Sequence, residues 1–185
     1  MISVVHSVPT ERELVERPRE LFGEATGDWF VLHCKSRQEK ALADDLSAMR
    51  VPHYLPLLRQ VRYHGRRKAM VEAPLFPGYL FVRGTLDQAY IADRTRRVAS
   101  ILKVPNQRQI DWELGNLWLA LSREAPVVEF PYLQKGVRVE VRSGPFRGLQ
   151  GIVEDRLARQ RILLQIDMLG RAVSVEIDGA LLEPI

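Results

Sequence analysis

In the first half of the chain, short apolar runs typical of strands alternate with segments whose apolar residues have helical spacing. This pattern predicts an α+β fold. The run at residues 29–34, Trp-Phe-Val-Leu-His-Cys, has the length and composition of a buried strand. Ser36 and Glu39 follow with the spacing of a capping box, which predicts a helix start. One face of this helix carries Leu42, Leu46 and Met49.

The pattern continues with a hairpin and a second strand–helix series. Residues 54–71 predict a hairpin whose tip is basic, and the apolar run at 79–82 follows a Pro-Gly turn, as a core strand would. We expect a helix over 85–97 and a strand over 101–104. Helical spacing of apolar residues then continues to residue 121, where this α+β unit is predicted to end.

The second half changes character after residues 122–133, which carry Pro126 and Pro131 without periodicity and predict a linker. Val137, Val139 and Val141 then alternate with charged residues, as in a strand with one wet face. Four more strand candidates lie at 149–154, 161–167, 172–177 and 181–182. Five short strands in about fifty residues predict a small β barrel.

The loop in "VEVRSGPFRGLQGIVE", residues 139–154, holds more turn residues than a chain reversal needs. Gly144, Pro145, Gly148 and Gly151 surround Phe146 and predict several special backbone conformations. We interpret the loop as a rigid display of an aromatic side chain. The alternative is that Phe146 plugs the end of the barrel.

Residues 1–27 form a polar, charged extension, in which Thr10-x-x-Glu13 could cap a short helix that Pro18 would interrupt. We expect it to be weakly ordered. It has neither the basic start nor the apolar core of a secretory signal, and no apolar run in the chain reaches membrane-spanning length. We therefore expect a cytoplasmic protein that does not contact a membrane.

Composition adds a basic balance, with a net charge of +4 and a pI near 9.5, which suits contact with nucleic acid. The single cysteine, Cys34, excludes an internal disulfide and a thiolate-rich zinc site. The four histidines have no ligand-like spacing, and no acid, base and nucleophile converge in the sequence. The sequence predicts no enzyme, no metal and no cofactor.

Two sets of motifs resemble a known family. Residues 144–153, GPFRGLQGIV, and 169–176, LGRAVSVE, resemble the KOW domain of the NusG/RfaH family of transcription factors. Trp29-Phe30-Val31, Glu39 and residues 76–82, FPGYLFV, resemble the NGN domain of that family, in the expected order. Cys34-Lys35 and residues 73–77, APLFP, are more similar to its specialised paralogues than to its housekeeping members.

The resemblance implies an α+β chain in which an NGN domain, an antiparallel sheet with flanking helices, is linked to a KOW domain, a five-stranded SH3-like β barrel. The implied boundaries are an extension at 1–27, NGN at 28–121, a linker at 122–133 and KOW at 134–185. The basic pair Arg96-Arg97 precedes Val98 where the family pattern often has a glycine, which puts the following turn and its polymerase contacts in doubt.

The resemblance also implies function: a monomeric bacterial elongation and antitermination factor. The NGN domain would bind the clamp helices of the largest subunit of RNA polymerase and suppress pausing or termination, shifting the clamp towards the closed state that it binds. It would lie near the non-template DNA strand. The KOW domain would recruit a small-subunit ribosomal protein or Rho. The alternatives are a housekeeping member acting with Rho in termination and a KOW-type RNA-binding or ribosome-associated protein.

Candidate site residues follow. The resemblance assigns polymerase binding to Tyr54, Phe76, Pro77 and Tyr79, although Phe76 and Tyr79 could instead fill the core. It assigns DNA binding to Lys35, Arg37 and Gln38 near a helix N-terminus, and the basic hairpin tip adds Arg62, Arg66, Arg67 and Lys68. These charged residues could instead be solvated loops. The candidates for binding a partner of the KOW domain are Phe146, Leu149, Met168, Leu169 and Arg171.

Overall fold

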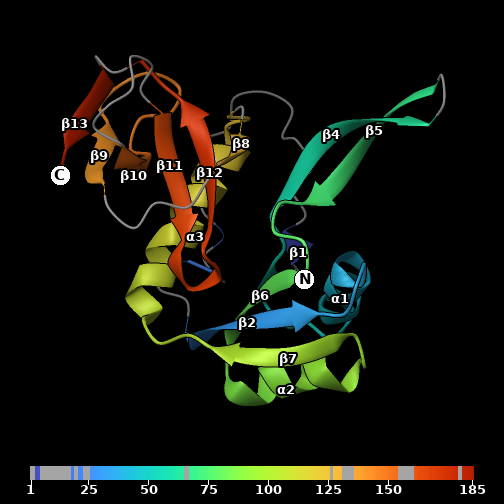
Figure 1. Ribbon diagram of the computed structural model, residues 1–185. Helices are drawn as coiled ribbons and strands as arrows, with labels where there is room; N and C mark the ends of the chain where they lie inside the picture. The colour runs from blue at the N-terminus through green and yellow to red at the C-terminus, as the bar shows by residue number, and fades with distance from the viewer. Residues whose placement is uncertain are drawn as a thin grey trace. The chain divides into compact units, whose positions relative to one another are not determined.

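The computed structural model describes residues 3–4, 18, 21–22, 26–64, 67–125, 127–130, 136–153, 161–178 and 181–185. The chain divides into two compact units, and each is described by itself (Figure 1). The first unit consists of Met1–Ser7 and Pro18–Gln107, and the second of Val8–Arg17 and Arg108–Ile185. The division falls at residue 107, whereas the sequence placed the end of the first domain at 121, so Arg108–Ser122 groups with the C-terminal unit.

A five-stranded sheet forms the centre of the first unit, in the order β1-β3-β6-β2-β7 (Figure 1). The strands are β1 (Ser3–Val4), β2 (Asp28–Cys34), β3 (His53–Tyr54), β6 (Tyr79–Gly84) and β7 (Val98–Lys103). β1 pairs with β3 in parallel, and the remaining pairs are antiparallel. The strands predicted at 29–34 and 79–82 are confirmed, while β7 begins three residues before the predicted 101.

Two helices, α1 (Glu39–Ala48) and α2 (Leu86–Arg94), pack on the sheet through its aliphatic face. Leu42 and Leu46 of α1 and Ala92 of α2 join strand residues in one buried cluster. The members of this cluster from the five-stranded sheet are Leu32, Cys34, Leu80, Val82 and Val98. The helix predicted at 85–97 is therefore shorter than expected, because the chain turns at residues 95–97 to enter β7.

The predicted capping box at Ser36 and Glu39 is wrong. The residue that caps α1 is Gln38, and its side chain makes no capping hydrogen bond. The Glu39 carboxylate instead accepts a hydrogen bond of 2.7 Å from the backbone N–H of Gly78, across the sheet edge. A complete capping box occurs at α2, where Thr85 and Gln88 satisfy each other's backbone N–H groups.

Aromatic side chains fill the other face of this sheet. Trp29, Tyr54 and Phe81 are wholly buried, and Phe22 packs against Trp29 and Tyr54 at ring-centroid distances of 5.6 and 6.0 Å. The interpretation of residues 1–27 as a polar extension is therefore wrong for Leu21 and Phe22, which are buried in the first unit. The Thr10-x-x-Glu13 helix start lies outside the described residues.

The predicted hairpin is confirmed as a separate two-stranded sheet of β4 (Leu57–His64) and β5 (Arg67–Pro74). Its register runs from Leu57 opposite Pro74 to His64 opposite Arg67. Arg67 and Lys68 therefore lie near the far end of a long antiparallel ribbon, where Arg67 is opposite His64 (Figure 1).

The second unit combines α3 (Gln107–Ser122, whose first residue belongs to the first unit) with a six-stranded sheet in the order β13-β9-β10-β11-β12-β8. Its strands are β8 (Val127–Phe130), β9 (Val137–Val141), β10 (Gln150–Val153), β11 (Arg161–Ile166), β12 (Arg171–Glu176) and β13 (Leu182–Pro184). The five predicted strands are confirmed with small shifts at their ends. The residues form strands, as the alternating valines indicated.

The segment predicted to be a linker contains a strand. β8 pairs antiparallel with β12, from Ala172 opposite Phe130 to Val175 opposite Val127. The run Val-Val-Glu-Phe is too short to show periodicity, yet it can pair with the edge of a sheet, so residues 127–130 form a strand where the sequence predicted a linker. No helix in the described part of the chain is both long and apolar enough to cross a membrane.

Candidate functional site

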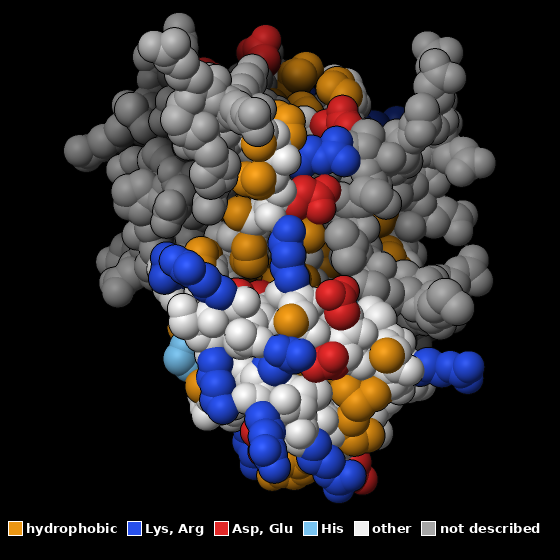
Figure 2. Space-filling model, turned by 90° about the vertical axis from the view of Figure 1, so that its right-hand side faces the viewer, with side chains coloured by type: hydrophobic (Ala, Val, Ile, Leu, Met, Phe, Trp, Pro, Cys, Tyr) orange, Lys and Arg blue, Asp and Glu red, His pale blue; other side chains and the backbone are white. Residues whose placement is uncertain are grey.

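The basic residues are concentrated in the first unit. Residues 26–107 contain 14 of the 27 Lys and Arg residues but only 7 of the 23 Asp and Glu residues, whereas residues 108–185 contain 10 and 11. Lys and Arg side chains gather over the face of the first unit that carries α1 (Figure 2). An excess of positive charge on one unit is what a polyanion would be attracted to.

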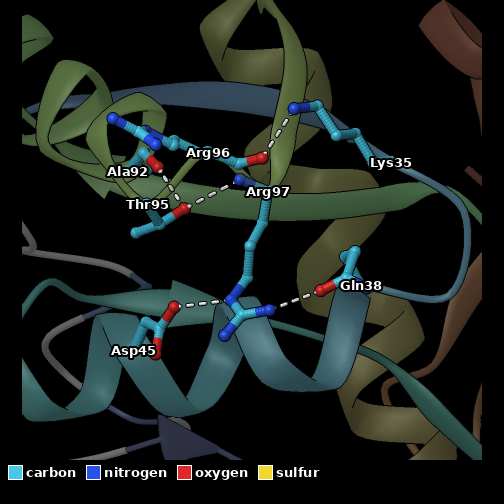
Figure 3. Close-up of polar contacts among 7 residues, drawn as sticks. All are labelled: Lys35, Gln38, Asp45, Ala92, Thr95, Arg96 and Arg97. Carbon is cyan, nitrogen blue, oxygen red and sulfur yellow. Dashed lines mark hydrogen bonds and ion pairs between the residues drawn. The ribbon is translucent and has the colours of Figure 1, made fainter.

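Two loops meet at this face. The loop from β2 to α1 contains Lys35, whose backbone N–H donates to the Arg97 carbonyl at 2.8 Å. The Lys35 ammonium donates to the Arg96 carbonyl at 2.7 Å. Both acceptors belong to the turn between α2 and β7, so Lys35 ties two loops that lie about sixty residues apart in sequence (Figure 3).

The Arg97 side chain ties the same turn to α1. Its guanidinium Nε donates to Asp45 Oδ2 at 2.7 Å, and its Nη1 donates to the side-chain carbonyl of Gln38 (Figure 3). The backbone N–H of Arg97 donates to Thr95 Oγ1 at 3.2 Å, which closes the turn. We call Arg97, Asp45 and Gln38 the arginine clamp.

Two arginines beside the clamp have left-handed backbones. Arg37 has φ of 59° and Arg96 has φ of 62°, conformations that residues with a side chain adopt only at a cost. Both side chains are exposed, as is that of Lys35. The hydrogen bonds around these two residues keep them in their unfavourable backbone conformations. The two loops are therefore fixed and carry exposed cations.

Of the predicted DNA-binding residues, Lys35 and Arg37 lie at this loop pair with exposed side chains. Gln38 is nearby, but its side-chain carbonyl is bound to Arg97. Arg62, Arg67 and Lys68 lie on the hairpin strands, where their side chains are not described, and Arg66 lies outside the described residues. No sequence motif indicated that Arg96 or Asp45 belongs to the site, and the pair Arg96-Arg97 differed from the family pattern only by the missing glycine.

The Phe-Pro-Gly-Tyr turn is only partly exposed. Phe76 is 3% exposed and packs edge-on against Phe81 at 6.5 Å, so the expectation of an exposed Phe76 side chain is wrong. Tyr54 is also wholly buried. Both rings are drawn into the aromatic face because β3 and the turn border it. Pro77 is exposed, and the half-buried Tyr79 stacks on the exposed His33 ring at 5.3 Å.

Buried titratable groups in the first unit do not offer nucleophilic chemistry. Burial, assisted by the Glu39 carboxylate, raises the pKa of the Cys34 thiol to about 12. Burial lowers the pKa of His53, whose Nδ1 lies 2.8 Å from the Val51 carbonyl oxygen. Among the described residues, no group of three or more His, Cys, Asp or Glu side chains could hold a metal ion.

In the second unit, the glycine-rich loop between β9 and β10 is held by its backbone. Gly148 has φ of 81°, and its N–H donates to the Val141 carbonyl at 2.9 Å. The Leu149 N–H donates to the Phe146 carbonyl at 3.0 Å. Gly151 is needed for a different reason, because a Cβ there would lie 2.6 Å from the Leu163 carbonyl oxygen. Backbone hydrogen bonds therefore hold the loop, and the Arg123 guanidinium adds one bond of 2.6 Å to the Arg147 carbonyl.

The predicted partner-binding residues divide into two groups. Phe146, Met168 and Leu169 are half-buried and Arg171 is exposed, so all four present surface on the glycine-rich loop or the turn before β12. Leu149 is wholly buried, and its assignment to the partner surface is wrong. Its position next to β10 places the side chain inside the sheet's core, while Phe146, three residues earlier, remains near the surface.

Helix α3 contacts the sheet of the second unit through polar groups. The Asn116 side-chain oxygen accepts from the Gln150 N–H at 2.9 Å, and the Trp112 indole donates to Gln150 Oε1 at 2.7 Å. The buried Glu113 carboxylate accepts from the Asp167 N–H at 3.2 and 3.3 Å. Burial, with a smaller effect of the Asp167 carboxylate, raises the pKa of Glu113 to about 7. These residues line a small cavity beside the turn that carries Met168 and Leu169.

Comparison with known proteins gives one consistent set of relatives. Residues 27–111 match the family model described as "Transcription termination factor nusG". The transcription termination/antitermination protein NusG of Neisseria meningitidis is 25% identical over 176 residues, covering 85% of this chain and 97% of that protein. The protein of the same name from Deinococcus radiodurans is 26% identical over 184 residues, covering 82% and 95%.

A solved structure, titled "Domain interaction in Thermotoga maritima NusG", is also similar. It is 19% identical with a TM-score of 0.41, and the alignment covers 88% of this chain and 99% of that one.

Proposed function

The chain belongs to the NusG family of transcription termination and antitermination factors, and on that premise we propose that it travels with RNA polymerase and suppresses pausing or termination. In this proposal the first unit binds the clamp helices of the largest polymerase subunit and the non-template DNA strand. The second unit recruits another protein. As a member of this family the chain is a transcription factor and not an enzyme.

One observation carries the proposal for DNA: the exposed residues Lys35, Arg37 and Arg96 belong to two loops that the Lys35 bonds and the arginine clamp hold together. A fixed group of cations can contact successive phosphates without losing much conformational freedom on binding. The unit that carries it also has the positive excess. The basic tip of the β4–β5 hairpin supplies a second cationic point on the same unit.

For polymerase binding, we propose a smaller surface than the sequence predicted, consisting of the exposed part of the Phe-Pro-Gly-Tyr turn. Pro77 and Tyr79 present the apolar contact, and the buried Phe76 supports the turn from below. The Glu39 carboxylate fixes the same turn through the Gly78 N–H. Such a rigid aromatic contact loses little entropy on docking.

For the second unit, we propose that Phe146, Met168, Leu169 and Arg171 bind a small-subunit ribosomal protein or Rho. With 10 basic and 11 acidic residues over 108–185, this unit has no positive excess that would favour an RNA phosphate backbone. The charge distribution therefore supports a protein partner for this unit over the alternative of a KOW-type RNA-binding protein.

A pull-down with purified core RNA polymerase at moderate salt tests the proposal. A complex held only by electrostatic attraction would dissociate at this salt concentration, because salt screens the charges. We expect the wild-type chain to be retained and Tyr79→Ser to be retained several-fold less. The matched control is Tyr90→Ser, which removes a more exposed tyrosine (52%) from α2. The control should bind as the wild type does.

Two results would contradict the proposal. Failure of the wild-type chain to bind core polymerase would remove the elongation-factor function. Equal losses for Tyr79→Ser and Tyr90→Ser would leave polymerase binding in place but remove its assignment to the Phe-Pro-Gly-Tyr turn.

A further inference from the structure

The arginine clamp joins the turn between α2 and β7 to two positions of α1. Arg97 stands at the end of the turn between α2 and β7, Gln38 stands at the start of α1, and Asp45 lies two turns further along that helix. The guanidinium bridges the two helix positions from outside (Figure 3). Its fork geometry allows both bonds at once, which a lysine ammonium would meet less well.

The guanidinium of Arg97 already binds two side chains within the chain. Its Nε is bonded to a carboxylate and its Nη1 to an amide carbonyl, so it is a weaker candidate for phosphate than the exposed Arg37 and Arg96. Its effect on a ligand is therefore indirect. It sets where the turn that carries Arg96 lies relative to the loop that carries Lys35 and Arg37.

Resting on the proposed function, we propose that Arg97 is a positioning residue, which with Asp45 and Gln38 preforms the surface of Lys35, Arg37 and Arg96 that takes a single-stranded DNA segment. Without the clamp, the two loops keep only the bonds of Lys35 to the turn. The left-handed conformations of Arg37 and Arg96 then relax, and the three cations no longer keep fixed positions relative to one another.

Asp45 gives this proposal an unusually clear test, because positioning and simple electrostatics predict opposite signs. Removing a negative charge near a DNA-binding surface strengthens binding if only long-range charge matters. If Asp45 acts by holding Arg97, the change Asp45→Asn weakens binding instead. Asp44, the preceding residue of α1, is an exposed carboxylate, so Asp44→Asn removes the same charge without touching the clamp.

The experiment measures binding of the full chain to a fluorescent random-sequence single-stranded DNA of about 12 nucleotides at low salt. Asp45→Asn and Arg97→Ala should each weaken binding roughly threefold or more, while Asp44→Asn binds equally or more tightly. The double variant should bind no more weakly than Arg97→Ala, since both changes break one clamp. An RNA of the same length is a second probe.

The outcomes distinguish failure of the proposed DNA contact from failure of the positioning role of Arg97. If the wild-type chain does not bind the DNA, the proposed DNA contact fails, and the positioning role fails with it. If it binds and Asp45→Asn behaves like Asp44→Asn, only the positioning role is overturned. Additive losses in the double variant would show that Arg97 contacts DNA itself. Tighter binding to the RNA would overturn the choice of DNA as ligand.

A measurement without ligand checks the physical basis. The Lys35 amide donates to the Arg97 carbonyl, so its hydrogen exchange reports whether the two loops stay together. Exchange of this amide should accelerate in Arg97→Ala and Asp45→Asn and stay unchanged in Asp44→Asn. Unchanged exchange in all three variants would show that the clamp does not hold the loops, and would overturn the proposal.

Discussion

The two units hold their candidate surfaces in different ways. In the first unit, one backbone hydrogen bond joins the loops of Lys35 and Arg96, and side chains add the remaining bonds, among them an ion pair between residues 52 positions apart. In the second, the loop of Phe146 is held mainly by backbone hydrogen bonds and by glycines at special positions, with one side-chain bond from Arg123. A side-chain clamp can be removed by changing one half-buried residue at little cost in stability, whereas a backbone-held loop cannot be loosened without strain in the sheet beside it.

The largest effect is expected for Gly151→Ala in the second unit. A Cβ there would lie 2.1 Å from Ile162 Cγ2 and 2.6 Å from the Leu163 carbonyl oxygen, so β10 and β11 would have to separate. We expect a loss of about 3 kcal/mol in the free energy of unfolding of this unit. Chemical denaturation followed by the amide signals of β10 and β11 measures it.

The control is Gly148→Ala, in the loop that precedes β10. Its φ of 81° disfavours a side chain, but the space around it is open. A loss of about 1 kcal/mol is expected from backbone strain alone. Equal losses at both glycines would show that the loop, and not the approach of the two strands, limits stability.

The second effect is a pH dependence of the stability of the second unit. Because burial raises the pKa of Glu113 from 4.5 to about 7, the folded unit binds a proton that the unfolded chain releases. This stabilisation is present at low pH and is lost as pH rises through about 7. Between about pH 5 and pH 8 the free energy of unfolding should fall by about 2 kcal/mol, measured by denaturant midpoints.

Glu113→Gln should flatten this profile, because an amide can still accept the Asp167 N–H but does not ionise. If the free energy of unfolding of the variant still falls over the same pH range, another group causes the pH dependence.

The third prediction concerns the displayed surface of the second unit. Phe146→Ala combined with Leu169→Ala removes two half-buried apolar side chains from neighbouring features of the predicted partner surface. We expect binding of the second partner, the ribosomal protein in the first instance, to weaken at least about tenfold, measured by titration of the full chain. Normal binding, or a large fall in the melting temperature of this unit, would instead show that Phe146 acts as a core residue.

The smallest stability effect is expected where the functional effect is large. Arg97→Ala removes an ion pair whose two side chains are 35% and 37% exposed, and such pairs contribute less than about 1 kcal/mol. The free energy of unfolding of the first unit should fall by no more than that, and the difference should shrink at high salt. A loss of several kcal/mol would mean that the clamp stabilises the unit, and its role in positioning would need another test.

The contrast between the units also explains what could be predicted from the sequence. Gly148, Gly151 and the alternating valines are local signals, so the strands of the second unit and its rigid loop were predicted with small shifts. The capping box at Ser36 failed because a long-range partner, the Gly78 N–H, took the Glu39 carboxylate. Local spacing cannot show such competition.

Burial was the harder property to predict. Phe76 and Leu149 each lie beside turn residues and looked exposed, yet the aromatic face of the first sheet and the core of the second draw them inward. Phe22 lies in a polar stretch of sequence, and only the pairing with Trp29 and Tyr54 reveals its place in the core. The Asp45–Arg97 pair carries no local signal at all.

An elongation assay with core RNA polymerase on a template with a defined pause site tests the central claim most directly. The account predicts that the wild-type chain shortens the pause, that Asp45→Asn shortens it less than Asp44→Asn does, and that Phe146→Ala with Leu169→Ala acts as the wild type. A wild-type chain without effect on the pause, or loss of the effect in the Phe146 and Leu169 variant alone, would contradict the division of work between the two units.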